Sequence, residues 1–536
     1  MSFFKTSSEV RTLFKRADQV SITEFDHLKV SVSEGYDWEP AIQQACNSLP
    51  NGGTVLIPNH SEFFDFYSPI TVPKNVDLLG TGGILRRRFN RTVASQSVRL
   101  EGNNKISFLK YDGGFDVIAP GAGENVYYQD FAPQDQVDGD YLFTGCTFSN
   151  SCGSFIVATG GSYVKVVGNH FIDWYDHCVY FAGRGVNDTD RYNKDIVVSG
   201  NTFRATKAST TRSAVKARNG VYNYSITGNT LDMATATFAE VGSGDSGEQR
   251  ENENIAISGN AGICSTFVSI GYSGTTGLDV PVERVNITGN AVECIEGMFE
   301  MGSLPSSSVS TLPDSQRGVH VKSLIISNNS LKGKGFLVNG QISANHDGIE
   351  TFTMNGNDME IVSTNYVLFP MGNISKLNFK NNTVSFLDQT SGAQIISMYR
   401  QSTYLNYNAS IVGEWTLEGN LLLKGAGKYV YENSAGKTET AFTFNLYLIN
   451  NRIDNDSTGK RLVQVVGDHK DTVTTTIVAK DNKFIGGTNQ ASDWKTDKTG
   501  LIEENEKQKI LTSPNGTVYK ITVDDTGVVT GALYTA

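Results

Sequence analysis

Two glutamates, Glu240 and Glu300, occupy the same place in two copies of a short repeated segment. The copies are residues 238–242 (FAEVG) and 298–302 (MFEMG), and a third copy between them, 267–271 (FVSIG), has Ser269 at that place. Two carboxyls held apart across a small residue can act together: one protonates a leaving oxygen, and the other, as carboxylate, activates a water. The spacing therefore predicts an acid–base pair for hydrolysis of a glycosidic bond.

The neighbouring copies supply candidate substrate contacts. If successive copies stack at the strand spacing of ~4.8 Å, the Cα atoms of Glu240 and Glu300 lie roughly 10 Å apart, with Ser269 leaving room for a sugar. Arg218, in the copy before Glu240 (residues 216–220), is expected next in line, where it would keep Glu240 ionised and bind a hydroxyl or an acidic sugar. Phe238 and Phe267 are expected on the outer face as platforms for sugar rings.

Other residues compete for these roles. Asp245, in the loop after Glu240, is the reserve catalytic carboxyl. The candidate binding set also contains Trp174, His177 and Tyr272. Asp176 and His177 are either an acid–base pair or a turn that holds a satisfied histidine. Equally, Glu240 and Glu300 can be read as part of a solvated or subunit-contact face.

A second repeat indicates the elements that position these residues. A short alternating apolar run followed by Gly-Asn or Asn-Asn recurs about every thirty residues. It ends at Asn169, Asn201, Asn229, Asn260, Asn290, Asn329, Asn357, Asn382, Asn420, Asn451 and Asn482. Alternation indicates strands, and a fixed period of this length indicates stacked repeats. The pattern predicts an all-β fold, a right-handed parallel β-helix, over a β-propeller or a β-sandwich.

The alternation also assigns faces to the strand that carries Glu240. Its second and fourth positions, such as Val268 and Ile270, are expected to point inward, and its first and third positions outward. The first positions are then an exposed apolar stripe of Phe238, Phe267, Met298, Phe336 and Leu368. Because soluble monomers rarely expose such a stripe, it predicts a homotrimer.

Composition excludes several classes of protein. The 536 residues carry a net charge of −11, which argues against a nucleic-acid partner. We see no signal peptide and no run long enough to span a membrane. The sequence has no zinc, calcium or phosphate-loop signature, so no metal and no cofactor are expected. Six cysteines are too few for a disulfide scaffold, and Cys264 and Cys294 are expected to stack inside the core.

Four segments are predicted along the chain. Residues 1–35 are an N-terminal attachment or leader segment, and 36–137 hold a capping helix at 37–50 and the first irregular coils. Residues 138–487 form the β-helix with the glycan site. Residues 488–536 form a C-terminal β element that closes a trimer. A helix over the first coil covers strand edges that would otherwise pair with other chains.

The two ends of the chain carry a resemblance. Residues 41–45 (AIQQA), 52–55 (GGTV), 69–73 (PITVP) and 78–80 (LLG) resemble the opening of the pectate-lyase-like right-handed β-helix family. Residues 511–523 (LTSPNGTVYKITV) resemble the closing strands of phage tail-fibre and tailspike proteins. That family includes bacteriophage tailspikes and capsule depolymerases.

The resemblance implies a virion tail protein that acts at the bacterial surface. It implies a homotrimer that attaches to the tail or baseplate through its N-terminus and binds and hydrolyses a bacterial surface polysaccharide, capsule or O-antigen. Lyases, hydrolases and non-enzymes share the fold. A polysaccharide lyase, with Arg218, Lys216 and His177 as its groups, and a spike that binds without cutting therefore remain alternatives.

Overall fold

The structure is a computed structural model, and the chain divides into two compact units. One unit is Met1–Asn286 with Asn290–Ile295, and the other is Ile287–Gly289 with Glu296–Ala536. The residues it describes are 18–89, 96–114, 129–133, 139–159, 162–183, 193–218, 220–243, 252–272, 282–301, 321–338, 349–364, 366–370, 374–387, 393–399, 412–424, 426–433, 443–454, 461–466, 474–485, 502–504, 508–512, 518–523 and 529–533.

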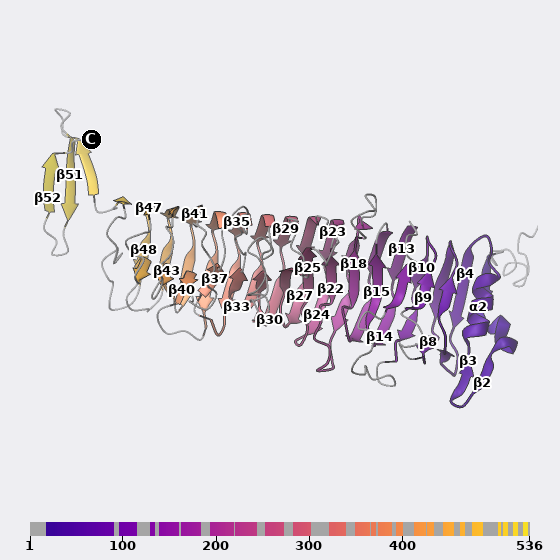
Figure 1. Cartoon of the computed structure of the whole chain (residues 1–536). Coiled ribbons are helices and arrows are strands. Elements are labelled where there is room, and N and C mark those ends of the chain that lie inside the picture. The colour runs from indigo at the N-terminus through magenta and orange to yellow at the C-terminus, as the bar shows by residue number, and fades with distance from the viewer. Residues whose placement is uncertain are drawn as a thin grey trace, which may run out of the picture. The chain divides into compact units, whose positions relative to one another are not determined.

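The first unit is built from three parallel sheets, whose strands stack coil upon coil (Figure 1). The first sheet holds β1 (Gln19–Ser21), β4 (Gly53–Pro58), β7 (Val76–Thr81), β10 (Lys105–Ser107), β13 (Gly139–Thr144), β16 (Ser162–Val167), β19 (Asn193–Lys194), β20 (Val197–Ser199), β23 (Val221–Thr227) and β26 (Glu253–Ser258). The second holds β5 (Phe64–Phe66), β8 (Ile84–Arg87), β11 (Lys110–Asp112), β14 (Thr147–Ser151), β17 (His170–Trp174), β21 (Thr202–Arg204), β24 (Thr230–Met233) and β27 (Ala261–Cys264). The third holds β6 (Ile70–Val72), β9 (Gln96–Leu100), β12 (Gln129–Pro133), β15 (Ser154–Thr159), β18 (Val179–Ala182), β22 (Val215–Arg218), β25 (Ala239–Ser243) and β28 (Val268–Tyr272).

The second unit repeats this plan, and the boundary between the units runs through β29 (Val282–Thr288) and β30 (Ala291–Gly297). Its first sheet holds β32 (Val321–Ser327), β35 (Ile349–Asn355), β38 (Ile374–Lys380), β41 (Val412–Glu418), β44 (Thr443–Ile449), β47 (Thr474–Lys480) and β49 (Ile502–Glu504). The second holds β33 (Ser330–Lys334), β36 (Asp358–Ile361), β39 (Thr383–Phe386), β42 (Leu421–Lys424), β45 (Arg452–Asp454) and β48 (Lys483–Ile485). The third holds β31 (Phe299–Met301), β34 (Phe336–Val338), β37 (Tyr366–Pro370), β40 (Ala393–Tyr399), β43 (Ala426–Asn433) and β46 (Arg461–Val466).

These parallel coils confirm the right-handed parallel β-helix. The last strands, β50 (Gln508–Thr512), β51 (Val518–Val523) and β52 (Val529–Leu533), form an antiparallel sheet within the segment predicted as a C-terminal β element. At the other end, α2 (Glu39–Asn47) buries Ala41, Ile42 and Ala45. Asp37 accepts a hydrogen bond from the Glu39 backbone N–H (2.9 Å), as expected of a residue that starts the helix.

The repeated asparagines from Asn169 to Asn451 are buried, and successive asparagines are hydrogen-bonded from coil to coil. Asn201 donates its backbone N–H and its Nδ2 to Oδ1 of Asn229, at 2.9 and 3.0 Å. Its Nδ2 also donates to the carbonyl of Val166 (2.9 Å). Asn229 repeats this with Asn260, and in the second unit an equivalent ladder runs from Asn329 to Asn482.

The left-handed turn residue is the one before each ladder asparagine. It is most often glycine, as at Gly228 (φ 63°) and Gly259 (φ 63°), and elsewhere asparagine or aspartate, as at Asn328 (φ 54°) and Asp481 (φ 58°). Glycine adopts this conformation without a Cβ penalty. The two residues of each Gly-Asn or Asn-Asn pair thus have different roles. The first residue makes the bend, and the second forms hydrogen bonds with buried backbone groups of neighbouring coils.

The predicted exposed apolar stripe is wrong. Phe238, Phe267, Met298, Phe336 and Leu368 are all buried, with at most 1% of each residue exposed. Phe238 and Phe267 stack inside the core with ring centroids 5.7 Å apart and planes at 4°. They lie just before β25 and β28, at the corner between two sheets, where two consecutive residues face inward and the alternation of a strand does not yet apply.

Candidate functional site

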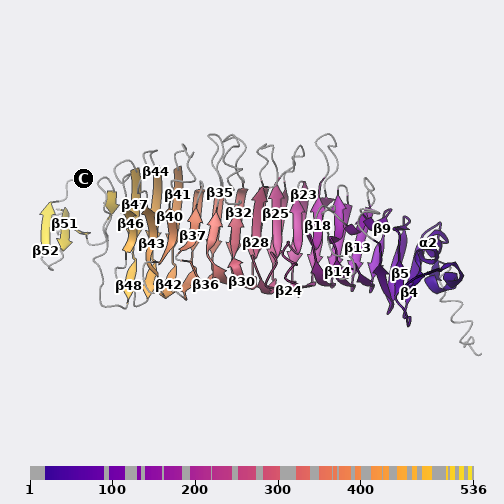
Figure 2. The same ribbon diagram turned by 60° about the horizontal axis from the view of Figure 1, so that its bottom comes forward.

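The candidate site lies on the outer face of the third sheet of the first unit, where β18, β22, β25 and β28 pair in succession. Figure 2 labels β18, β25 and β28. The register of the four strands aligns Tyr180, Lys216, Glu240 and Ser269 in one outward column. The predicted alignment of Glu240 with Ser269 is therefore confirmed. The predicted place of Arg218 in this column is wrong, since Lys216 pairs with Glu240 and Arg218 pairs with Gly242.

The same error affects the preceding coil. Its copy is residues 179–183 (VYFAG), in which the alternation predicts Phe181 outward and Tyr180 inward, but Phe181 is fully buried and Tyr180 is partly exposed. Alignment of the copies by their terminal glycines gives this error, because the distance from strand to glycine differs between coils. Val268 and Ile270 do point inward, as predicted.

Glu240 is one of four residues joined by a closed ring of hydrogen bonds, with Lys216, His177 and Ser213. Lys216 Nζ lies 2.7 Å from Glu240 Oε1 and 3.0 Å from Nε2 of His177. His177 Nδ1 lies 2.6 Å from Oγ of Ser213, which donates to Glu240 Oε2 at 3.2 Å. A lysine ammonium only donates, so Nε2 of His177 accepts and its Nδ1–H donates to Ser213. Every polar atom of the ring thereby has a consistent role.

This ring moves the pKa values of its members. Burial first, and then the charge of Lys216, lower the pKa of His177 to about 3, so the imidazole is neutral. Burial alone would raise the pKa of Glu240, but the charge and hydrogen bond of Lys216 outweigh it, and the pKa lies below its ordinary value. Glu240 is therefore held as a carboxylate, with 27% of its side chain exposed.

Asp176 lies on the other side of the same imidazole. Its Oδ1 is 3.7 Å from Nε2 of His177, and Oε2 of Glu240 is 3.7 Å from Nδ1. Burial raises the pKa of Asp176, and the charges of Arg212 and Lys216 offset this only in part. Two carboxyls that flank one ring thus have pKa values displaced in opposite directions, the arrangement that separates an acid from a base.

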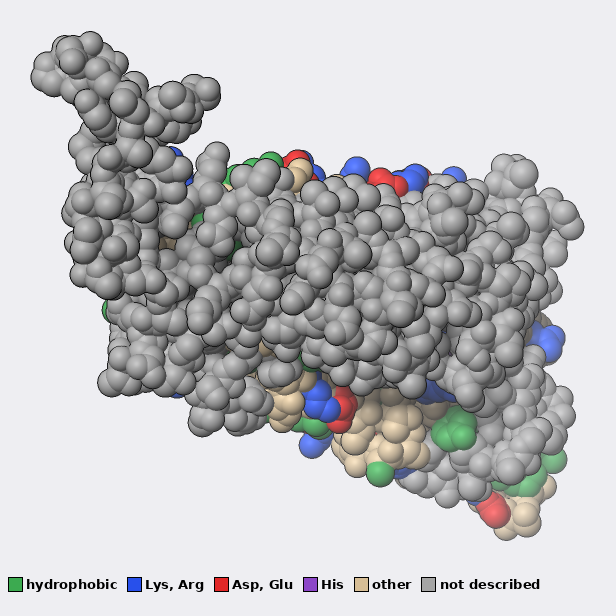
Figure 3. Space-filling view, turned by 60° about the vertical axis from the view of Figure 1, so that its left-hand side comes forward, with side chains coloured by type: hydrophobic (Ala, Val, Ile, Leu, Met, Phe, Trp, Pro, Cys, Tyr) green, Lys and Arg blue, Asp and Glu red, His purple; other side chains and the backbone are tan. Residues whose placement is uncertain are grey.

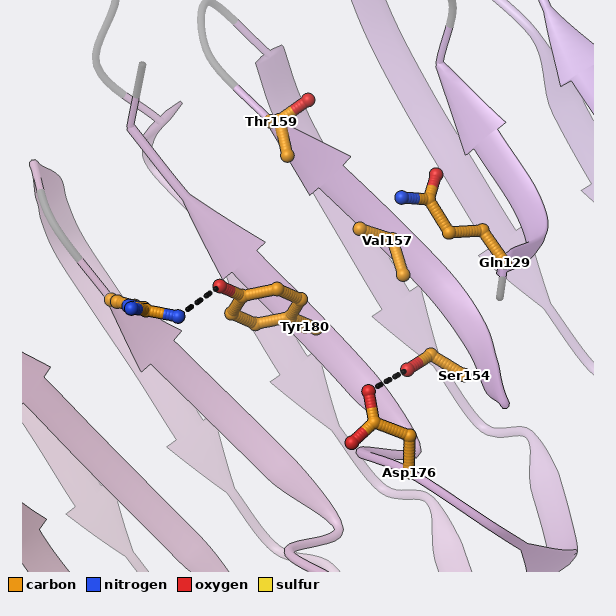
Figure 4. Close-up of a pocket in the computed structure, with 7 residues that line it drawn as sticks. Gln129, Ser154, Val157, Thr159, Asp176 and Tyr180 are labelled. Carbon is orange, nitrogen blue, oxygen red and sulfur yellow. Dashed lines mark hydrogen bonds between the residues drawn. The ribbon is translucent and has the colours of Figure 1, made fainter. Parts of the chain in front are cut away.

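Asp176 opens into a pocket of about 310 Å³ on the outer face of the sheet (Figure 4). Val157 and the ring of Tyr180 provide its apolar surface. Polar groups surround them: Gln129, Ser154, Thr159, Asp176 and Arg218. Ser154 donates to Asp176 Oδ2 (3.4 Å), and Arg218 donates to the Tyr180 hydroxyl (3.4 Å). An apolar surface with polar groups at its edge is suited to a sugar ring.

A buried carboxylate anchors the segment that delivers Ser213. Asp173 accepts the backbone N–H groups of Thr206 (2.6 Å) and Lys207 (3.0 Å), and its own backbone is left-handed (φ 54°). Trp174 is fully buried and donates its indole N–H to the carbonyl of Arg212 (3.1 Å). Trp174, predicted to bind substrate, is buried instead and supports the segment that ends at Ser213.

The remaining predicted residues are dispersed. Phe238 and Phe267, predicted as sugar platforms, are buried core residues. Glu300 lies on β31 in the second unit, half-buried, and burial raises its pKa while Lys334 opposes the rise. Its pairing with Glu240 stays a prediction. Asp245 and the side chain of Tyr272 lie outside the described residues.

Sequence reasoning did not assign Ser213, Tyr180 or Gln129 to the site. The signal for Tyr180 was present, since counting from the first residue of each strand, Val179, Val215 and Ala239, gives the observed register. Nothing in the spacing indicated Ser213, because it reaches the ring from the segment that precedes β22.

Within the described part of the chain, no three His, Cys, Asp or Glu side chains come together as a possible metal site. No described helix is long and apolar enough to cross a membrane. Cys264 and Cys294 pair in register on β27 and β30 and are buried, as predicted.

The sequence matches no family model and no curated protein. The structure is similar to a solved mutant of the tailspike protein of E. coli bacteriophage HK620 in complex with a pentasaccharide, at 14% identity, over 96% of this chain and 85% of that chain, with a TM-score of 0.50. The chain has the fold of a phage tailspike. The pentasaccharide complex of the HK620 tailspike without that mutation matches over the same shares at 14% identity and a TM-score of 0.48. At this identity the likeness concerns the tailspike fold alone, and the predicted right-handed β-helix family is confirmed at that level.

Proposed function

We propose that this chain is a phage tailspike that binds a bacterial surface polysaccharide, capsule or O-antigen, and hydrolyses its glycosidic bonds. The observation that carries the proposal is the pair of carboxyls, Asp176 and Glu240, whose pKa values are displaced in opposite directions beside a sugar-sized pocket. The HK620 tailspike, solved in complex with a pentasaccharide, has the same fold, which supports the proposal.

Each carboxyl has a role that fits its surroundings. Asp176 opens into the pocket, and burial raises its pKa, so Asp176 is the carboxyl proposed to donate a proton to the leaving oxygen. Glu240, held ionised by Lys216, activates the attacking water. Inverting glycosidases keep their two carboxyls about 6.5–9.5 Å apart to admit that water. A single imidazole stands between these two carboxyls, each 3.7 Å from one of its nitrogens.

Hydrolysis is proposed rather than elimination because of the surroundings of His177 and Lys216. A lyase needs a base to remove a proton next to a uronate carboxylate. His177 is buried and its Nε2 lone pair is engaged by Lys216, whose Nζ is itself 2.7 Å from Oε1 of Glu240. Neither residue is therefore a ready base. A β-elimination product absorbs ultraviolet light because it is unsaturated, and we expect no such absorbance from the products.

The test is incubation of the full chain with a panel of bacterial capsules and O-antigens, followed by mass analysis of the products. Asp176→Asn and Glu240→Gln should each reduce turnover about a hundredfold or more, the scale of a lost general acid or base. Asp232→Asn is the control, because Asp232 is an exposed carboxylate of the same unit, paired with Arg204.

Glu300→Gln in the same panel tests the pair predicted from sequence. A loss with Glu240→Gln and Glu300→Gln, and normal turnover with Asp176→Asn, would make Glu300 the partner of Glu240. Unchanged polymer length with retained binding would establish a spike that binds without cutting. Normal turnover in all three variants would refute the carboxyl assignment and direct attention to Asp245.

The proposal includes the setting implied by the fold. The tailspike would act at the bacterial surface as a homotrimer attached to the virion through its N-terminus. The five residues of the predicted apolar stripe are buried and so do not support a homotrimer. The similarity to tailspikes is the support for the proposed homotrimer, and the mass of the protein in solution tests it.

A further inference from the structure

One corner of the first unit is longer than its neighbours, and it borders the candidate site. Between β21 and β22 the chain passes from the second sheet to the third through residues 205–214, the long corner. In the coils before and after, residues 175–178 and 234–238 make the same passage. The neighbouring coils turn with fewer residues, so connecting the sheets does not by itself explain the long corner.

Asp173, near the end of β17 in the preceding coil, holds the first part of the long corner. Its Oδ1 accepts the backbone N–H groups of Thr206 (2.6 Å) and Lys207 (3.0 Å) and the hydroxyl of Thr210 (3.4 Å). Its Oδ2 accepts the hydroxyl of Thr206 (2.5 Å). Acidic side chains are visible at the surface in Figure 3, whereas only 3% of Asp173 is exposed. A buried carboxylate is costly unless it is hydrogen-bonded, so these contacts fix the long corner to β17.

Trp174, the next residue of β17, holds the last part of the long corner. Its indole N–H donates to the carbonyl of Arg212 (3.1 Å). The carbonyl of Ser213 accepts the backbone N–H of Cys178, in the corner of the preceding coil (3.0 Å). Two adjacent residues of one strand, Asp173 and Trp174, thus fix the long corner near both of its ends.

The long corner presents one side chain to each carboxyl of the proposed pair. Burial alone would raise the pKa of Glu240; the charge of Lys216 lowers it most, and the hydrogen bond from Ser213 (3.2 Å) adds to that effect. Burial raises the pKa of Asp176, and the charge of Arg212 opposes this rise more than any other group does. Ser213 and Arg212 therefore both favour the ionised form of the carboxyl that they face.

Other charged or titratable groups face the pair from outside the long corner. In the described part of the chain these are His177, Lys216, Tyr180 and Arg218. They come from the turn before β18, from β18 and from β22. The printed contacts of the long corner with the pair thus run through Ser213 and Arg212.

Resting on the proposed function, we propose that Asp173 is a positioning residue, which holds the long corner so that its end sets the pH range of hydrolysis. Turnover needs Glu240 ionised and Asp176 protonated, so it falls in acid as Glu240 gains a proton and in alkali as Asp176 loses one. Release of the long corner takes a donor, Ser213, from Glu240 and a cation, Arg212, from Asp176. Each loss raises a pKa, so both limbs of the pH profile move to higher pH.

The test measures turnover against pH with a panel polysaccharide that the full chain cuts. Ser213→Ala should move the acid limb alone to higher pH, and Arg212→Gln the alkaline limb alone. At a pH on the acid limb, Ser213→Ala should lose about tenfold in turnover, the scale of one hydrogen bond to a charged group. Asp173→Gly removes the carboxylate, and glycine suits the left-handed backbone there (φ 54°), so this variant should move both limbs. Adding Ser213→Ala to Asp173→Gly should move the acid limb no further, because both remove the same contact.

Three variants separate positioning from stability. Asp173→Asn keeps an acceptor oxygen for the backbone N–H groups of Thr206 and Lys207, so it should keep the pH profile of the unmodified chain. Thr206→Val removes one contact with Asp173 and should move both limbs in the same direction by less. Asp195→Gly is the matched control, because Asp195 is also left-handed (φ 52°) but exposed, and it should move neither limb. A variant that is only less stable loses turnover at every pH.

The outcomes separate this inference from the proposed function. If the chain cuts a polysaccharide but Ser213→Ala and Arg212→Gln leave both limbs in place, the positioning role is refuted while hydrolysis stands. Limbs that stay in place in Asp173→Gly, or in Thr206→Val if Asp173→Gly does not fold, refute the role of Asp173. If the chain cuts no polysaccharide of the panel, both the inference and the proposed function fail.

Discussion

Replacement of Lys216 by methionine removes the cation that joins the ring around Glu240. Lys216 lies 2.7 Å from Glu240, and their side chains are only 9% and 27% exposed. Breaking a buried ion pair from one side leaves the other charge uncompensated and costs about 3–5 kcal/mol. The variant should lose that much free energy of unfolding, measured by denaturant titration of the full chain at pH 7.

A matched control separates burial from mere pairing. Lys380 and Glu418 lie 2.8 Å apart in the second unit, but 37% and 41% of their side chains are exposed. Exposed pairs contribute about 0–1 kcal/mol. Lys380→Met should therefore change the free energy of unfolding little. Equal losses in Lys216→Met and Lys380→Met would show that the ring around Glu240 is not sheltered from solvent.

The dependence on pH follows from the lowered pKa of Glu240. A carboxyl with a lowered pKa in the folded state adds stability above its unfolded pKa of about 4.3, and the gain is lost as the pH falls through the folded value. The gap between the unmodified chain and Lys216→Met should thus close in acid. Adding Glu240→Gln to Lys216→Met should restore stability at pH 7. A double variant no more stable than Lys216→Met would refute the account of an uncompensated carboxylate.

Three other outcomes are expected. Asn260→Leu should lower the free energy of unfolding by about 1–3 kcal/mol or more, because the N–H of Asn229 loses its buried acceptor; denaturant titration measures it. Phe238→Ala should lower the free energy of unfolding by about 3–5 kcal/mol, as for a core phenylalanine. A loss near zero would indicate that Phe238 is exposed. Light scattering should give the mass of a trimer at micromolar concentration, and a monomer mass would overturn that proposal.

The fold was predictable because the same short motif ends a strand of the first sheet in coil after coil, from Asn169 to Asn482. The bend needs a left-handed residue and the ladder needs a side-chain amide, so Gly-Asn persists where the flanking apolar residues vary. The spacing of the motif gives the coil length directly. The motif does not predict the lengths of the segments that connect the sheets. Those lengths determine which residues of neighbouring coils lie side by side.

The candidate site shows the effect of those lengths. Glu240 and Ser269 aligned correctly because both strands end at the same distance from their glycines. Arg218 was displaced by one alternation because its coil is longer at that end. Phe238 was assigned outward because alternation was extended past the strand into a corner. A period of two holds only within a strand, and corner residues follow the packing of the core instead.

The carboxyl pair arises from two different kinds of position. Glu240 is in mid-strand, where the register of β22 and β25 fixes Lys216 beside it and keeps it ionised. Asp176 comes from the turn before β18, where its backbone N–H bonds the carbonyl of Gly153 and its carboxyl is shielded by Ser154. A strand position gains its partner from the neighbouring coil, whereas a turn position gains burial without a guaranteed counter-charge. Opposite pKa displacements therefore follow from placing one carboxyl on the sheet and the other at its corner, with His177 fixed between them.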